Sequence, residues 1–222
     1  MKRTGLFGGT FNPIHLGHLH AALAVKNRYD LDKIIFIPSA LPPHKKPVGI
    51  ADARDRIEMT RIAIAGRPGF SISDLELKRT GPSYSIDTLS YFKQIPPADV
   101  NLYFILGLDA FLEIDTWKSY RELIQQISFI VMTRPGTGDA PDAETWKIAG
   151  DHLKAIVSEG YQFSTSQSCF AHDKHPPVHM VDVAPLDISS TRIRQYVRTG
   201  RSIESLVPGG VDNYINKQGL YR

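Results

Sequence analysis

The chain has 222 residues, of which 42% are hydrophobic and 22% are charged, and its formal net charge at pH 7 is +3. It is therefore long and apolar enough to bury a sizeable core. The weak positive charge is compatible with an anionic small substrate but does not indicate a nucleic-acid partner. The single cysteine, Cys169, excludes an internal disulfide and is typical of a reducing compartment. We expect a cytoplasmic protein with no membrane partner, because no apolar stretch reaches signal-peptide or membrane-spanning length.

A glycine-rich turn near the start of the chain predicts a phosphate-binding site. Residues 5–18 read GLFGGTFNPIHLGH, which predicts a strand, a tight turn and the start of a helix. Gly8 and Gly9 allow a bound group to approach the backbone, and the helix N-terminus attracts an anion. His15 and His18 lie on one side of the first helical turn and can donate further hydrogen bonds. The glycine spacing fits neither common phosphate-binding motif, and the alternative is a turn before a buried helix with incidental histidines.

The rest of the chain alternates between predicted helices and predicted strands. Helical periodicity predicts helices over 16–29, 52–65, 111–126, 146–157 and 188–198, one that begins with Ser85 as its N-cap, and a short one over 213–216. Apolar runs predict strands over 4–7, 33–38, 70–73, 101–106, 128–132 and 178–183, whereas 39–49 is predicted as a loop and 158–177 as irregular. This alternation predicts one doubly wound α/β domain over 1–222, a Rossmann-like parallel sheet with a small helical addition at 188–222 that packs on the sheet.

A second candidate anion site lies at the start of the late helix. Residues 188–194 read ISSTRIR, with three consecutive hydroxyl side chains. These can cap the helix or donate to an anion, and Arg194 adds a planar fork suited to phosphate oxygens. Taken alone, this string favours a serine cap with solvated arginines.

The two segments together resemble the signature of a known enzyme superfamily. GGTFxPxHxGH at 8–18 and ISxTxIR at 188–194 are similar to the motifs of the HxGH nucleotidyltransferases. Further segments make the chain similar to the bacterial nicotinate-nucleotide adenylyltransferases: PPHK at 42–45, PSYSIDTL at 82–89, LGLD at 106–109, TW at 116–117, RPG at 134–136 and YINKQGLY at 214–221. The resemblance implies adenylyl transfer from ATP to nicotinate mononucleotide, giving deamido-NAD and pyrophosphate in NAD biosynthesis.

The same resemblance implies a role for particular residues. It implies an ATP site that contains Gly8, Gly9, Thr10, Phe11, His15, His18, Lys45, Asp109, Ile188, Ser189, Thr191 and Arg194. Within that set it implies catalytic roles for His15, His18, Lys45 and Arg194. It implies a nicotinate mononucleotide site that contains Ser39, Ser85, Trp117 and Arg134. A Mg²⁺ ion would be held mainly through the ATP phosphates, without dedicated protein ligands.

Several points stay open from the sequence. Asp109 can accept ribose hydroxyls or cap a helix, and Trp117 can stack on a pyridine ring or belong to the core. Position 12 is Asn, where many members of the resembled family carry Asp, which puts a carboxylate role there in doubt. Both a monomer and a homodimer are compatible with the sequence. A sister enzyme that uses nicotinamide mononucleotide or phosphopantetheine, and a non-enzymatic nucleotide sensor, remain alternative functions.

A histidine-rich stretch near the C-terminus is a weaker signal. Cys169, His172, His175 and His179 lie close together in sequence. Their spacing matches no zinc motif and prolines interrupt the stretch, so a solvated loop is favoured over a metal site.

Overall fold

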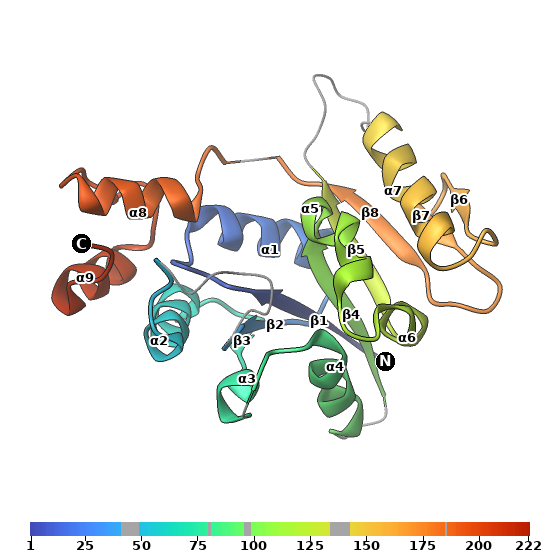
Figure 1. The fold of residues 1–222 in the computed structure, drawn as a ribbon, viewed down its shortest axis with the longest axis horizontal. Coiled ribbons are helices and arrows are strands. Elements are labelled where there is room, and N and C mark those ends of the chain that lie inside the picture. The colour runs from blue at the N-terminus through green and yellow to red at the C-terminus, as the bar shows by residue number, and fades with distance from the viewer. Residues whose placement is uncertain (41–48, 80, 96–98, 134–142, 185) are drawn as a thin grey trace.

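The computed structural model describes residues 1–40, 49–79, 81–95, 99–133, 143–184 and 186–222. Within these residues the strands form one sheet in the order β3-β2-β1-β4-β5-β8-β7-β6 (Figure 1). The strands are β1 Lys2–Gly9, β2 Lys33–Pro38, β3 Phe70–Ile72, β4 Val100–Gly107, β5 Ser128–Thr133, β6 Gln162–Ser164, β7 Cys169–Ala171 and β8 Val178–Asp182. The pairs from β3 through β8 are parallel, and β7 and β6 extend the sheet in antiparallel fashion.

Helices cover both faces of this sheet. The helical segments are α1 Leu16–Arg28, α2 Ala53–Ile64, α3 Leu75–Lys78, α4 Ser85–Gln94, α5 Leu108–Leu112, the 3₁₀ turn η1 Ile114–Thr116, α6 Tyr120–Gln126, α7 Ala143–Ile156, α8 Ser190–Arg198 and α9 Gly209–Gln218. In Figure 1, α1 lies on one side of the strands and α4 on the other. Within the described part of the chain, none of these helices is long and apolar enough to cross a membrane.

Side-chain alternation along the central strands divides the core into two clusters. Phe7 of β1 and Ile105 of β4 belong to the cluster that includes α1, α2, α8 and α9. Leu6 and Phe104, one position away, belong to the cluster beneath α4, α5, α6 and α7. Because successive strand residues point to opposite faces, a strand covered on both sides must be apolar at every position. This is why the central strands are continuous apolar runs in the sequence.

The predicted α/β class and the predicted central strands are confirmed, but the sheet is not wholly parallel. The segment predicted as irregular, 158–177, contains the antiparallel hairpin β6–β7. Each of its strands has three residues, and most of β6 is exposed. Strands this short carry too few residues for an alternation pattern to be recognised.

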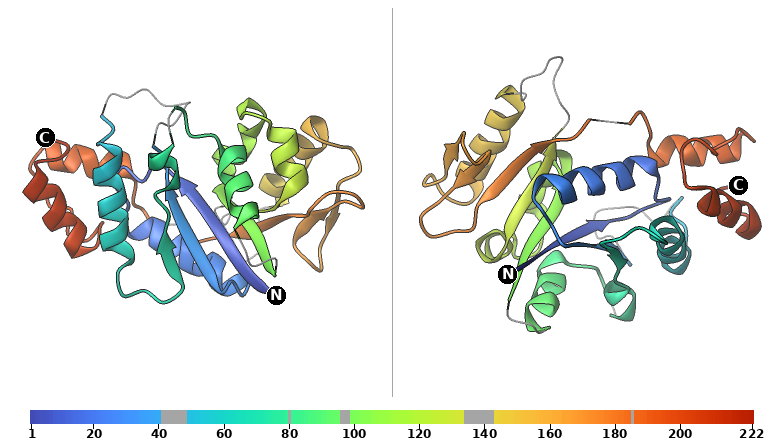
Figure 2. Two further views of the ribbon diagram at one scale, coloured as in Figure 1. Left: turned by 90° about the horizontal axis from the view of Figure 1, so that it is seen from below. Right: turned by 180° about the vertical axis from the view of Figure 1, so that it is seen from behind.

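The C-terminal helices pack at one end of the sheet, beside α2, while β6 and β7 lie at the other end (Figure 2). Helix α9 begins at Gly209, four residues before the predicted start. The prediction began too late because Gly209 and Gly210 are residues that usually interrupt helices. A Cβ atom on Gly210 would lie 2.7 Å from Cγ2 of Ile62 in α2. The glycine therefore permits close packing between two helices rather than a turn.

The order of the central strands positions a crevice. Strand β1 pairs with β2 on one side and with β4 on the other. The chain first adds β2 and β3 on one side of β1 and then adds β4 and β5 on its other side, so the order of strand addition reverses at β1. In open α/β sheets, ligands bind outside the carboxyl ends of the strands at such a switch point. Here those ends are Gly9 and Gly107, where neither strand presents a side chain to a ligand.

Candidate active site

The glycine-rich turn leads directly into α1, as the sequence predicts. His15 is the N-cap residue with an extended backbone, and His18 lies in the first turn. Their rings stack with centroids 3.7 Å apart, and the backbone N–H of His15 donates to Nδ1 of His18 at 3.3 Å. That hydrogen bond assigns the proton of a neutral His18 ring to Nε2.

The two histidines differ in their surroundings. The His15 side chain is 7% exposed, and burial lowers its pKa from 6.5 to about 4. His15 is therefore a neutral imidazole at pH 7 and can serve as a hydrogen-bond donor but not as a cation. A Cβ atom on Gly17 would lie 3.0 Å from Nδ1 of His15, so the glycine leaves room for the buried ring.

A cavity of about 530 Å³, which we call the histidine pocket, opens beside this turn. His15, His18, Asp109 and Ile188, all predicted site residues, line it together. The lining also includes Phe7, Gly17, His20, Ala21, Gly107, Leu108, Met132, Thr133, Thr145, Val183, Ala184 and Leu186. Asp109 lies in the first turn of α5, whose N-cap is Gly107, so the alternative prediction of an Asp109 cap is wrong.

The start of α8 meets the glycine-rich turn although 177 residues separate them in sequence. Ser189 caps α8 by accepting from the backbone N–H of Arg192, which is one of the two roles that the sequence left open for these hydroxyl residues. Ser190 Oγ donates to the Pro13 carbonyl at 2.9 Å. Arg194 donates to the Asn12 carbonyl at 2.8 Å and to Thr191 Oγ1 at 3.2 Å. The Arg194 guanidinium is thus held beside the turn.

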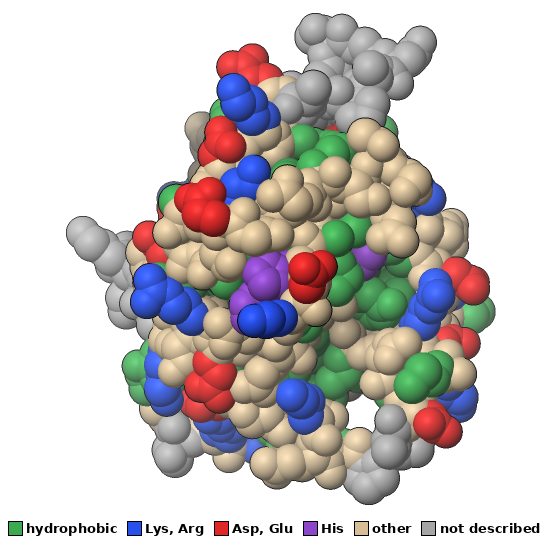
Figure 3. Space-filling model, turned by 90° about the vertical axis from the view of Figure 1, so that its right-hand side faces the viewer, with side chains coloured by type: hydrophobic (Ala, Val, Ile, Leu, Met, Phe, Trp, Pro, Cys, Tyr) green, Lys and Arg blue, Asp and Glu red, His purple; other side chains and the backbone are tan. Residues whose placement is uncertain are grey.

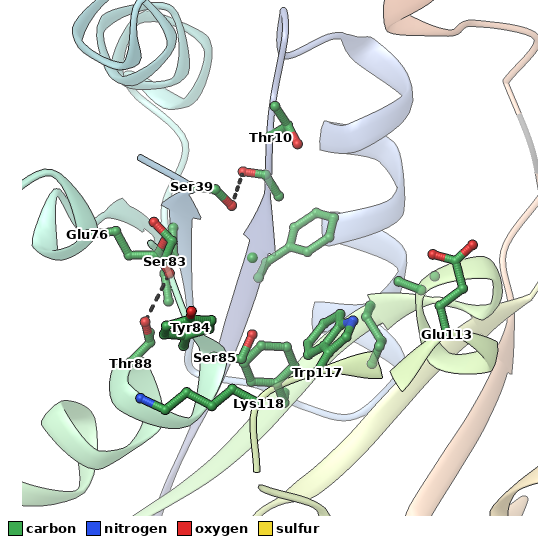
Figure 4. A pocket seen from close by; sticks show the side chains of 18 residues that line it. Thr10, Ser39, Glu76, Ser83, Tyr84, Ser85, Thr88, Glu113, Trp117 and Lys118 are labelled. Carbon is green, nitrogen blue, oxygen red and sulfur yellow. Dashed lines mark hydrogen bonds between the residues drawn. The ribbon is translucent and has the colours of Figure 1, made fainter. Parts of the chain in front are cut away.

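A second cavity, of about 270 Å³, lies on the other side of β1, and we call it the serine pocket. The predicted substrate residues Ser39, Ser85 and Trp117 line it together. The lining also includes Phe7, Gly8, Gly9, Thr10, Ile37, Glu76, Ser83, Tyr84, Thr88, Phe104, Leu106, Gly107, Ala110, Glu113 and Lys118. Figure 4 shows Glu76, Ser83 and Thr88 on one side of this pocket and Trp117 on the other.

The segment before α4 presents both polar and aromatic groups to the serine pocket. Ser85 is the first residue of α4 and Tyr84 is its N-cap, so the predicted Ser85 cap is wrong. Tyr84 has an extended backbone and precedes the first helical residue, so the helix starts one residue earlier than the serine pattern indicates. The Lys118 ammonium lies 4.6 Å from the centre of the Tyr84 ring and 3.6 Å from a carboxylate oxygen of Asp87. Lys118 therefore brings a positive charge to this pocket.

A buried arginine joins the glycine-rich turn to loops beside the serine pocket. The Arg56 side chain is 1% exposed and donates to the carbonyls of Ala51, Thr10 and Ala40 at 2.8 to 3.1 Å. The Ala40 N–H in turn donates to Ser83 Oγ at 3.0 Å. Burial lowers the pKa of Arg56. The guanidinium thus connects the glycine-rich turn to the residues that follow β2.

Glu76 is a buried carboxyl group at the edge of the serine pocket. It is 8% exposed, and Thr88 Oγ1 donates to its Oε1 at 2.9 Å. Burial raises the pKa of Glu76, an effect that the neighbouring Ser83 and Thr88 hydroxyls partly offset. Sequence reasoning missed Glu76 because it lies in the four-residue helix α3, which carries no periodic signal. Lys118 and Thr88, by contrast, adjoin or lie within motifs already noted in the sequence.

Four predicted site residues that the structure describes, Phe11, Ser189, Thr191 and Arg194, line neither pocket. Lys45 and Arg134 lie outside the described residues. Phe11 is 3% exposed and belongs to the core, where its ring contacts those of Phe7 and His18. Its backbone has a φ of 47°, so the turn itself takes an uncommon conformation at this residue.

The histidine-rich stretch lies at the far end of the sheet. Cys169 is buried in β7 and pairs in register with His179 of β8, while the His172 and His175 rings lie 4.2 Å apart. Among the described residues, no group of three or more His, Cys, Asp and Glu side chains is placed to hold a metal ion. Acidic and basic side chains intermix on this face (Figure 3).

The crevice at the switch point, with its glycine turn and two helix N-termini, defines a Rossmann-like nucleotide-binding protein. Residues 6–196 match the model of the cytidylyltransferase-like family. Proteins named as probable nicotinate-nucleotide adenylyltransferases from Desulfatibacillum aliphaticivorans and Syntrophotalea carbinolica are 42% and 40% identical to this chain. These alignments cover 99% of this chain in each case, and 99% and 97% of the two relatives. The chain therefore belongs to the nicotinate-nucleotide adenylyltransferases of the cytidylyltransferase-like family, enzymes of NAD biosynthesis.

Solved structures share the fold. The Plasmodium falciparum nicotinic acid mononucleotide adenylyltransferase complexed with NaAD superposes with a TM-score of 0.72, over 100% of this chain and 98% of that one. Its sequence identity is 20%, so this likeness concerns the fold alone.

Proposed function

We propose that the protein transfers the adenylyl group of ATP to nicotinate mononucleotide, forming deamido-NAD and releasing pyrophosphate. The observation that carries this proposal is the common wall of the two pockets, because Phe7 and Gly107 line both. Ligands bound in the two pockets meet at the carboxyl ends of β1 and β4. Transfer between two bound substrates requires such an approach of their reacting groups.

In this proposal the histidine pocket holds ATP. His15 and His18 donate to the phosphates, and Asp109 accepts the ribose hydroxyls. The first turn of α8 and Arg194 take the outer phosphates, a role supported by the contacts that hold the arginine beside the glycine-rich turn. Helix N-termini and planar guanidinium groups suit phosphate oxygens.

The serine pocket holds nicotinate mononucleotide in the same proposal. Trp117 stacks on the pyridine ring, and Ser85 with the N–H groups at the start of α4 receives the nicotinate carboxylate. A site for the acid needs donors, whereas a site for the amide also needs an acceptor. The Lys118 ammonium lies 4.6 Å from the centre of the Tyr84 ring, but Asp87 at 3.6 Å offsets part of its charge, so the choice of the acid is supported mainly by the family to which the chain belongs. We therefore propose nicotinate mononucleotide rather than nicotinamide mononucleotide as the acceptor.

The reaction needs alignment and charge stabilisation more than proton transfer. The 5′-phosphate oxygen of the acceptor attacks the α-phosphorus of ATP. The bond from that phosphorus to the oxygen that bridges the α- and β-phosphates breaks, and this oxygen leaves with pyrophosphate. The nucleophile is already ionised at neutral pH, so no general base is needed. Donors fixed around the α-phosphate stabilise the charge that develops there and on pyrophosphate. His15 does this as a neutral imidazole, because its pKa of about 4 excludes a cation at pH 7.

Mg²⁺ fits this site as an ion carried by the nucleotide. Asp109 is the carboxylate in the lining of the histidine pocket, and within the described residues there is no carboxylate cage. Mg²⁺ typically keeps several waters and binds through phosphates with one or two carboxylates. When bound, it would neutralise phosphate charge. Lys45 and Arg134 remain proposed phosphate ligands, and the chain is proposed to work as a single domain, either as a monomer or as a homodimer.

Pyrophosphate release tests the function directly. Purified protein with ATP and Mg²⁺ should release pyrophosphate with nicotinate mononucleotide and far more slowly with nicotinamide mononucleotide or phosphopantetheine. Faster release with either of those acceptors would instead identify a sister enzyme. No release with any acceptor, together with ATP binding, would leave a nucleotide sensor.

His18→Ala tests the proposed stabilisation of the transition state. We expect kcat to fall about 100-fold, the usual effect of removing one preorganised donor, while KM for ATP changes by less than about threefold. Steady-state kinetics at saturating nicotinate mononucleotide measure both constants. A rise in KM for ATP with kcat unchanged would assign His18 to ground-state binding, and equal losses in kcat and in ATP affinity would count against a role confined to the transition state.

A further inference from the structure

The Asn12 side chain holds two points of the segment that precedes α2. Asn12 is 6% exposed, and its Nδ2 donates to the Gly49 carbonyl at 2.9 Å. Its Oδ1 accepts from the Ala51 N–H at 3.0 Å and from the Tyr221 hydroxyl at 2.7 Å. The amide thus uses its donor and its acceptor at once, and these partners fix which way it faces.

The main chain of Asn12 is part of the proposed phosphate site. Asn12 lies within the glycine-rich turn, three residues before His15, and its carbonyl accepts from Arg194 at 2.8 Å. A shift of Asn12 therefore moves both the turn and the guanidinium proposed to hold the outer phosphates.

Tyr221 reaches Asn12 from beyond the end of α9, 209 positions away in the sequence. Its φ is 64°, in the left-handed region that bulky residues rarely adopt. Such a conformation persists only where surrounding contacts hold it, and it concentrates at functional sites. The tyrosine is half-buried, and burial raises the pKa of its hydroxyl, so the group remains a donor to Asn12 at all ordinary pH values.

We propose that Tyr221 is a positioning residue for the phosphate site and acts through Asn12. The proposal rests on the proposed adenylyl transfer for its kinetic part. Tyr221 orients the Asn12 amide, the amide fixes Gly49 and Ala51, and the Asn12 carbonyl stays in place to receive Arg194. An aspartate at position 12 has no donor for the Gly49 carbonyl, so the asparagine of this chain is suited to this contact.

The test compares two tyrosines near the C-terminal end. Tyr221→Phe removes the hydroxyl that contacts Asn12. Tyr214→Phe is the matched control, because the Tyr214 hydroxyl donates to Asp55 of α2 at 2.9 Å and supports the same region without touching Asn12. We expect Tyr221→Phe to lower kcat/KM for ATP about tenfold, the effect of one buried hydrogen bond, with KM for nicotinate mononucleotide within about twofold of the wild type. We expect Tyr214→Phe to leave both values within about twofold.

Amide hydrogen exchange provides a readout that does not need activity. The Ala51 N–H should exchange at least about tenfold faster in Tyr221→Phe than in the wild type, and at the wild-type rate in Tyr214→Phe. Unchanged exchange at Ala51 would overturn the proposal, as would equal kinetic losses in the two variants. If the wild type releases no pyrophosphate, the proposed function fails while the exchange experiment still decides whether Tyr221 positions Asn12.

A double-mutant cycle excludes a merely structural role. We expect Asn12→Ala to lower kcat/KM for ATP, and adding Tyr221→Phe to it to lower the value no further, because the tyrosine acts through the lost amide. Additive losses would show that Tyr221 acts independently of Asn12 and would overturn the proposal.

Discussion

The buried His15 ring predicts a specific loss of stability in acid. Its pKa is 6.5 in the unfolded chain and about 4 in the folded protein, because burial disfavours the cation. Between these values the unfolded state binds the extra proton, so the free energy of unfolding falls as the pH drops below 6.5. Linkage between the two pKa values gives a loss of about 2 kcal/mol at pH 5, relative to pH 7.5.

The measurement is urea unfolding of the wild type and of His15→Asn at pH 7.5 and pH 5. The difference in free energy of unfolding between the two proteins should shrink by about 2 kcal/mol at the lower pH, because the variant lacks the titrating ring. Other groups with shifted pKa values, such as His179 and Glu76, are present in both proteins and cancel in the difference. His20→Asn, at an exposed position on the same helix, is the control. A pH-independent difference for His15→Asn would refute the assignment of a neutral, buried His15.

Two further substitutions test the packing around the site. Gly17→Ala should lower kcat with little change in KM for nicotinate mononucleotide. The new Cβ atom would lie 3.0 Å from Nδ1 of His15 and would displace the His15 ring. Steady-state kinetics with each substrate varied in turn measure both constants. Arg56→Ala should lower the free energy of unfolding by about 3 to 5 kcal/mol, because three carbonyls lose a charged donor in a buried site. Urea unfolding beside the exposed Arg54→Ala as control measures that loss, and equal effects in the two variants would contradict it.

The parts of the site that depend on short stretches of sequence could be predicted. The glycines, the proline and the His15–His18 pair lie within eleven residues, and their local spacing is enough to indicate a turn before a helix. Ser189 as a helix cap follows in the same way from the residues beside it. The long apolar strands were predictable because burial on both faces requires apolar residues at every position.

Contacts between distant segments could not be predicted. The hydrogen bond between Tyr221 and Asn12 depends on where α9 packs, and no local pattern encodes that position. Gly210 reads as a helix breaker until the side chain of Ile62 is seen against it. Glu76 lies in a helix of a single turn, where neither periodicity nor capping signals have room to develop.

The common wall of the two pockets has a consequence for how the site can be blocked. Since Phe7 and Gly107 border both cavities, the two cavities are neighbours at the carboxyl ends of β1 and β4, within reach of one linked molecule. A compound that links an aromatic acid to a nucleoside through a short spacer converts its second binding event into an intramolecular one. Effective concentration then raises its affinity over that of either half by about 10² to 10⁴ when the spacer matches the span.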